Sequence, residues 1–593
     1  LKFKEWHSLF EEASATMTAF MSGRATRTVV LLIFSSWLSN RAPDLSIVAW
    51  AVTIVYGLIF AYLMFETVQA ADLKPAVWGL LSPLIVLRDL SYEEFFSVDS
   101  APKDVAARRQ AAFERLSDNW YERWPKSQEI SKRLLRVWPD LRFKSSGFES
   151  TFPIFQKVFT DKFNMVTVLS EVNGTDITDV DGQIHLDSGG SYGVNCYGHT
   201  RFKEFMDAGN QVAQKCSVSL GPVHPLALEN IDMLRSMFRK DEVTFHMSGT
   251  EAIMAAVQQV RFHTGRPLIA VFKGAYHGWW DGVMQGAGNE RFNADCLVLK
   301  DQDLASLNLL RLRAREIAGL IVNPVQGFGW TNSTTSTTGH PVVRAGLEAI
   351  ERFQLWLLKV RETCTKNKIP LIFDETWCFQ LGPGGAQDTY GVEADIVTLG
   401  KALGGGHAVG AVCGPSWLME RRDPERAMRV SFAVGTFKGS PMVMGSINAV
   451  LRWVRTPQAA QAFDSLKDNV ARWSSTCNAT LKNEDLPISV SAYRNMWCVC
   501  YHQKSAYQFL FQVYLRNEGL QMVWVGTGKM LLNLEFTEAD FQRLTDILVR
   551  AGKAFKEDGW WWPGGKSIAL LPLVLRPTIR YHFRRLLSWR LGQ

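Results

Sequence analysis

The residues of this chain most suited to chemistry are a lysine and an acid, each at the end of a predicted strand. Lys401 follows the strand-like sequence DIVTLG and precedes Ala-Leu-Gly-Gly-Gly, and Asp374 ends the apolar run 369–373. A lysine forms a Schiff base with an aldehyde only when its amine is neutral, so its surroundings must lower a pKa that is about 10.4 in water. A carboxylate at a strand end can pair with a protonated pyridine nitrogen. The pair predicts a site for an aldehyde cofactor with a pyridine ring.

A short polar turn could hold a phosphate group. Ser248, Gly249 and Thr250 come directly before a predicted helix. The first amides of a helix are free to donate, and the positive end of the helix dipole attracts anions. An ordinary helix cap uses the same residue types, so the turn is not specific by itself.

Four further side chains could complete such a site. Tyr276 could stack on a pyridine face, with His277 beside it. Gln326 could reach a ring hydroxyl, and Thr436 could donate to a phosphate. Packing or loop structure explains each of them equally well when it is taken alone. The order and spacing of the whole set indicate that the cofactor is pyridoxal 5′-phosphate (PLP).

The composition limits the classes of function. The 593 residues are too many for one ordinary domain, and 47% of them are hydrophobic, enough for a large core. A formal net charge of +7 does not predict a nucleic-acid partner. The nine cysteines include no CxxC pair, so we expect neither a metal site nor a disulfide framework, and we favour a reducing compartment.

The elements that must position the site belong to an α/β fold. Between about residues 230 and 455, apolar strand-like runs alternate with helical stretches. This alternation predicts a mainly parallel, buried sheet with helices on both faces, in which sites lie at the carboxyl ends of the strands. After about residue 455 the pattern becomes mixed α+β, which indicates a second, smaller domain.

Together the motifs resemble those of class III aminotransferases of PLP fold type I, especially the glutamate-1-semialdehyde aminomutase-like branch. The resemblance covers roughly residues 148–560 and includes DVDGQIHLD, GVNCYGH, SGTEA, FKGAYHG, NPVQG, LGKALGGG, GTFKGSP and LEFTEADF. It implies a large domain at about 230–455 and a small domain built from the flanking segments.

The resemblance also implies roles for individual residues. Lys401 would hold PLP and then shuttle a proton between the substrate Cα and C4′ of the cofactor. Asp374 would bind the pyridine nitrogen, Gly249 and Thr250 the phosphate, and Tyr276 would stack on the ring. The family further implies a homodimer, in which Thr436 reaches the phosphate of the neighbouring subunit.

One segment departs from the family pattern. From Asp374 onward the chain reads DETWCFQ, a segment that is one residue shorter than usual and has Gln380 in place of an arginine. Asn323 likewise stands where many members have Glu. Both changes argue against a dicarboxylate or glutamate-like substrate, because an arginine is the usual carboxylate anchor.

Three functions remain open at this point. The leading prediction is an aminotransferase that moves an amino group from a small amino donor to a carbonyl acceptor. The alternative is a 2,1-aminomutase, which would use the same residues. A catalytically silent scaffold is the third, supported only by the altered segment DETWCFQ.

The N-terminal region predicts a membrane attachment. Residues 45–65 form a run of 21 residues without a charge, and a spanning helix needs roughly 20 such residues. A buried core helix is the alternative. The shorter apolar run 29–38 could complete a hairpin that keeps the catalytic domain in the cytoplasm. We therefore expect a membrane-associated region at 1–90, followed by a charged helical linker at 91–147.

The C-terminal end predicts a second membrane contact. Residues 561–593 form a basic tail without acids, next to the triplet Trp560-Trp561-Trp562. Such a segment can lie on an anionic leaflet, although a surface extension or a partner-binding helix has the same composition. An enzyme anchored in this way favours a lipid-like or carrier-bound acceptor.

Overall fold

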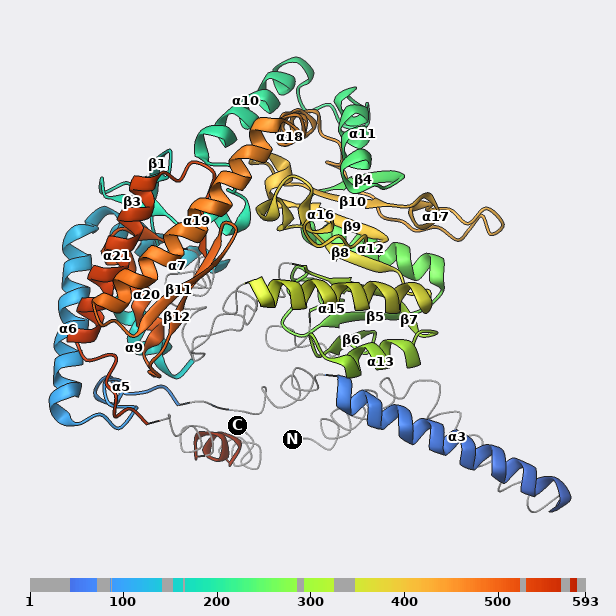
Figure 1. Ribbon diagram of the computed structural model, residues 1–593, viewed down its shortest axis with the longest axis horizontal. Coiled ribbons are helices and arrows are strands. Elements are labelled where there is room, and N and C mark those ends of the chain that lie inside the picture. The colour runs from blue at the N-terminus through green and yellow to red at the C-terminus, as the bar shows by residue number, and fades with distance from the viewer. Residues whose placement is uncertain are drawn as a thin grey trace, which may run out of the picture.

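The computed structural model describes residues 43–71, 86, 88–140, 153–163, 166–284, 293–324, 347–522, 530–566 and 576–583. Figure 1 shows two bodies, each with its own sheet and helices, joined through helices α18 (Pro441–Val454) and α19 (Pro457–Asn483). The larger body contains the predicted catalytic residues. The smaller one gathers segments from both ends of the chain.

The larger body is built on a seven-stranded sheet in the described part of the chain. Its strands, in spatial order, are β4 (Glu242–His246), β10 (Gly410–Gly414), β9 (Ile396–Gly400), β8 (Leu371–Asp374), β7 (Ile317–Val322), β5 (Leu268–Phe272) and β6 (Cys296–Leu299). The five strands from β9 to β6 pair in parallel, and β10 runs antiparallel to both of its neighbours. The predicted mainly parallel sheet is therefore confirmed.

Alternate residues of each strand face opposite layers of helices. On one face, Ile269 and Val271 pack with helix α12 (Gly249–Thr264). On the other, Ala270 and Phe272 pack with helices α13 (Leu304–Leu312) and α15 (Leu347–Lys366). Because side chains alternate along a strand, a run that is apolar at every position is buried on both faces. Figure 1 shows these helices lying along the sheet.

Helices α11 (Leu226–Phe238) and α17 (Ser416–Met419) lie beside the edge strand β4. The larger body also contains α10 (His199–Cys216) and α16 (Gly385–Tyr390). Helix α10 packs closely on α18, where Gly209 faces Ser446. A side chain at Gly209 would meet the Met442 carbonyl oxygen at 2.7 Å, so the two helices can approach only through small residues.

The smaller body has two sheets in its described residues. The first orders β1 (Leu169–Asn173), β2 (Asp176–Asp179), β3 (Ile184–Asp187) and β13 (Leu520–Gln521), and the second β11 (Ile488–Tyr493), β12 (Met496–Tyr501) and β14 (Met530–Leu531). Helices α9 (Pro153–Phe163), α19, α20 (Phe511–Asn517) and α21 (Glu538–Glu557) share its core. A capping box between Thr537 and Asp540 starts α21. The smaller body therefore mixes helices with two small sheets.

The segment predicted as a charged linker contains helices that pack on the smaller body. They are α5 (Tyr92–Phe95), α6 (Lys103–Arg123) and α7 (Pro125–Val137). The apolar side of α6 buries Phe113 and Trp120 in the core of the smaller body. Arg109 of the same helix is fully buried and pairs with Asp99 through two bonds of 2.8 and 2.9 Å.

The structure contradicts the prediction that the protein is membrane-associated. Helix α3 (Pro43–Ala70) contains the run 45–65, but no helix in the described residues meets the length and apolar character needed to cross a bilayer. The last turns of α3 instead dock on the larger body. The Glu66 carboxylate accepts a 2.6 Å bond from Asn308, and the buried Ala70 accepts one from the Lys300 amide. The possible hairpin arm 29–38 lies outside the described residues.

The tryptophans before the C-terminal tail also have a different role from the predicted one. Trp560 and Trp561 are buried in the core of the smaller body, and the Trp560 indole donates a 2.6 Å bond to the Tyr514 hydroxyl. They therefore hold the end of α21 in place rather than facing a lipid surface. Beyond them, residues 576–583 are helical, and Thr578 bonds to the backbone of Val86.

Candidate active site

The predicted catalytic residues meet at one edge of the large sheet. Strands β8 and β9 end there at Asp374 and Gly400, directly before Lys401. Strand β4 ends at the same edge, two residues before Ser248, because Gly410 of β10 pairs with both His246 and Gly400. The carboxyl ends of parallel strands form the usual crevice for ligands in such sheets.

Lys401 opens the short turn η5 (Lys401–Gly404) in an unusual backbone conformation. Its φ is +49°, in the left-handed region that non-glycine residues rarely adopt. Burial lowers the pKa of its amine, and the nearby negative charge of Asp374 opposes that effect by raising it. A lowered pKa increases the neutral fraction of the amine, which is the form that attacks an aldehyde.

Asp374 is held from several sides. Oδ2 accepts a 2.9 Å hydrogen bond from His277 Nδ1, and the imidazole carries its proton on that nitrogen because a carboxylate can only accept. Oδ1 accepts a 2.6 Å bond from the Thr376 hydroxyl. The aspartate is almost fully buried, and the hydroxyl of Thr398 on β9 lies 3.5 Å from Oδ1. These contacts fix the orientation of a carboxylate whose remaining lone pairs can accept the pyridinium proton of PLP.

The turn before α12 has the geometry of a phosphate site. Ser248 caps the helix by accepting a 3.2 Å bond from the Glu251 amide. Gly249 lies close to two other segments at the sheet edge: a Cβ there would meet the Thr376 side chain at 2.9 Å, and a Cβ on Gly400 would meet the Gly249 nitrogen at 3.3 Å. Only residues without side chains let the strand end and the turn come this close.

The loop after β5 reaches the same turn. Gly278 packs so tightly on Thr250 that a Cβ would lie 2.4 Å from its hydroxyl oxygen. Tyr276 in this loop is 58% exposed, whereas His277 is buried. Among the described residues His277 Nε2 has no hydrogen-bond partner, so a buried polar atom remains available at the site. The helix terminus, the held carboxylate and this orphaned nitrogen together fit PLP.

Two further residues, Gln326 and Thr436, were predicted to contact the cofactor. Gln326 lies outside the described residues. Thr436 is exposed, in a loop with the exposed apolar side chains of Phe432, Val434 and Phe437. The role of Thr436 on a neighbouring subunit stays a prediction.

The structure adds three residues that the sequence did not single out. Thr376 and Thr398 bond to Asp374, and Trp377 lies beside Lys401 with its ring centroid 5.4 Å from Nζ. Thr376 could have been found, because a hydroxyl two residues after an acid commonly bonds back to it. Nothing in the sequence indicated that Trp377 and Lys401 lie next to each other.

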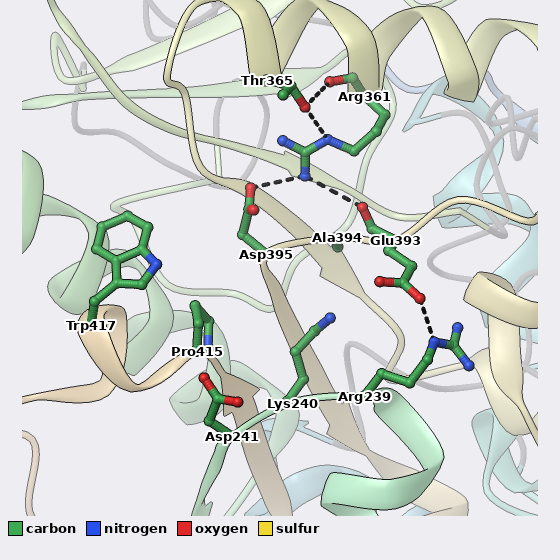
Figure 2. Close-up of a pocket in the computed structure, with 10 residues that line it drawn as sticks. All are labelled: Arg239, Lys240, Asp241, Arg361, Thr365, Glu393, Ala394, Asp395, Pro415 and Trp417. Carbon is green, nitrogen blue, oxygen red and sulfur yellow. Dashed lines mark hydrogen bonds and ion pairs between the residues drawn. The ribbon is translucent and has the colours of Figure 1, made fainter.

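A separate open cavity lies at the opposite edge of the large sheet. Figure 2 shows its lining, which comes from the segments before β4 and β9 and from the end of α15. Arg361 binds Asp395 at 2.9 Å, Arg239 pairs with Glu393, and Trp417 forms one wall. None of the predicted site residues lines this cavity, so it is distinct from the catalytic edge.

Solved structures share this fold. A glutamate-1-semialdehyde aminomutase from Pseudomonas aeruginosa PAO1 matches with a TM-score of 0.62 at 20% identity, covering 76% of this chain and 99% of that one. A β-phenylalanine aminotransferase from Variovorax paradoxus matches with a TM-score of 0.60 at 24% identity, covering 77% and 98%. The fold is thus PLP fold type I.

Sequence comparison then gives the family. The family model described as aminotransferase class-III matches residues 159–337 and 345–551, more than half of the chain. A glutamate-1-semialdehyde 2,1-aminomutase from Alkaliphilus oremlandii is 32% identical over 359 residues, 58% of this chain and 77% of that protein. One from Hydrogenobaculum is 27% identical over 415 residues, 64% and 90% respectively.

The chain belongs to the class III aminotransferase family, in its glutamate-1-semialdehyde aminomutase-like branch. It is a PLP-dependent enzyme, and the solved relatives include a transaminase with PLP bound. The predicted family and cofactor are confirmed. The roles of the individual site residues stay proposals.

Proposed function

We propose that the protein transfers an amino group from an amino donor to a carbonyl acceptor, with Lys401 as the residue that holds PLP. The observation that carries this proposal is the convergence of Lys401, Asp374 and the N-terminus of α12 at one sheet edge. When bound, PLP supplies an aldehyde and a ring that acts as an electron sink.

Each residue then has one task. The Lys401 amine, whose pKa is lowered by burial, would hold the cofactor and, once released, would move the substrate proton at Nζ. Asp374, oriented by His277 and Thr376, keeps the ring nitrogen protonated. The amides of the turn before α12 bind the phosphate.

The test is reduction of the PLP-loaded protein with borohydride, followed by mass mapping of the modified peptide. We expect a phosphopyridoxyl group on Lys401 and none in the Lys401→Ala variant. Lys240→Ala is a matched control, because burial also lowers the pKa of Lys240 but this lysine lies in the cavity at the opposite sheet edge. A label that moves to Lys240, or survives in Lys401→Ala, would contradict the proposal.

A second candidate is a 2,1-aminomutase, because both relatives compared by sequence carry that name. The same site residues would serve it. An assay without external amino donor separates the two: sustained turnover of an amino aldehyde indicates the mutase, and strict dependence on a donor indicates the aminotransferase.

The family likeness also supports a homodimer. The exposed loop that carries Thr436 bears several exposed apolar side chains, which a second subunit would cover. Thr436 would then donate to the phosphate of the neighbouring subunit. Sedimentation of the purified protein tests the assembly, and a monomer at micromolar concentration would contradict it.

A further inference from the structure

Trp377 lies in the segment DETWCFQ, which departs from the family pattern. It follows Asp374 by three residues, and the Lys401 Nζ lies 5.4 Å from the centroid of its ring. On Gly193, a Cβ would approach within 2.9 Å of the indole Cζ2, so the backbone of Gly193 packs directly on the ring. The indole therefore occupies space next to the amine at which the substrate must react.

The backbone on both sides of Trp377 is fixed. The buried Glu375 carboxylate accepts bonds from the amides of Ala386 at 2.8 Å and Gln387 at 3.3 Å. Thr376 is tied to Asp374, and Arg494 donates to the Leu381 carbonyl. An indole between such anchors keeps its position when a substrate enters, because the segment has little freedom to swing away.

The face of the Trp377 indole favours some chemical groups over others. The face of an indole is apolar and carries the negative side of the ring quadrupole, so it attracts cations and hydrocarbon and repels a carboxylate. Arg494, in the same region, donates through Nη1 to the Leu381 carbonyl and lies 5.8 Å from the centroid of the Tyr493 ring. The indole face therefore favours contact with hydrocarbon over contact with a second acid group.

We propose that Trp377 is a specificity-determining residue that selects amino donors or acceptors bearing an aromatic or aliphatic group beside the reacting carbon, in preference to dicarboxylic amino acids. This inference rests on the proposed function, because it assumes that Lys401 is the reacting lysine. Discrimination by contact with one apolar surface is typically about tenfold to a hundredfold.

The experiment measures the first half-reaction, in which an amine changes the visible spectrum of the PLP-loaded enzyme, so no acceptor has to be known. The two probes are 1-phenylethylamine and glutamate, and the variants are Trp377→Ala and Trp377→Phe. We expect Trp377→Ala to lower the preference for the aromatic amine at least tenfold and Trp377→Phe to keep most of it. Trp417→Ala is the control, because Trp417 is 58% exposed at the opposite sheet edge.

A second measurement does not depend on turnover. An indole face stabilises a positive charge at Lys401 Nζ, so Trp377→Ala should lower the pH midpoint of the cofactor's visible absorbance by about half a unit. The inference would be overturned if Trp377→Ala left unchanged both the ratio of the rates with 1-phenylethylamine and glutamate and the pH midpoint of the cofactor absorbance. Failure to label Lys401 in the wild type would instead overturn the proposed function, so the two failures are distinguishable.

Discussion

Replacing Gly410 with Ala should weaken PLP binding by roughly tenfold to a hundredfold without removing any side chain from the site. Gly410 begins β10 between β4 and β9, at the register of His246 and Gly400. A Cβ at this position would lie 2.0 Å from the Ser248 carbonyl oxygen and 2.6 Å from its carbonyl carbon. The neighbour is backbone, so the clash cannot be relieved by rotating a side chain.

The size of the effect follows from that distance. Ordinary contacts begin near 3.4 Å, so either β10 or the turn before α12 must shift by more than an ångström. Overpacking of this kind costs about 1–3 kcal/mol. If that free energy is lost from the phosphate-binding geometry, the dissociation constant of PLP rises by roughly one to two powers of ten.

The assay is a titration of the apo-protein with PLP, monitored by the absorbance of the cofactor. Urea unfolding of each variant is measured in parallel. Gly414→Ala is the matched control in the same strand, because its Cβ would meet the Met419 sulfur at 2.9 Å, and a thioether side chain can move aside. We expect its affinity to stay within about twofold of wild type. A wild-type PLP affinity in Gly410→Ala would refute the claim that β10 positions the phosphate turn.

Three further predictions follow from the contacts described above. Asp374→Asn should shift the pH midpoint for acetylation of Lys401 in the apo-protein to lower pH, because the Asp374 charge raises the pKa of this amine; an unmoved midpoint would mean that the two groups do not interact. Arg109→Met should lower the free energy of unfolding in urea by about 3–5 kcal/mol, because Asp99 stays buried without its partner, and a loss under about 1 kcal/mol would contradict this. Thr436→Ala should raise the PLP dissociation constant about tenfold while the assembly stays the same size, and an unaltered constant would place Thr436 away from the phosphate.

The large sheet was predictable because its signals are local. Strands such as β5 and β7 are apolar at every position, and the polar residues that follow them mark their carboxyl ends. The same local logic predicted Lys401, Asp374 and the turn at Ser248 as site residues. Each of these lies at the end of a strand or the start of a helix, where a few neighbouring residues are enough to indicate the geometry.

The N-terminal helix shows where local signals fail. The run 45–65 is apolar all round, a composition shared by membrane spans and by helices that pack on protein. Its helical state was predictable, but its surroundings were not. The end of the helix makes contact with the larger body, where Glu66 and Ala70 bond to Asn308 and Lys300, more than two hundred positions further along the chain.

The sequence by itself determined the family and the cofactor, and it predicted the lysine and the acid of the site, because those follow from motifs within short segments. Only the tertiary structure decided that His277 holds Asp374 from 97 residues away, that Trp377 lies beside Lys401, and that Trp560 is buried. The physical reason is that hydrogen-bond partners and burial depend on which distant segments the chain brings together, and that is a property of packing rather than of local pattern.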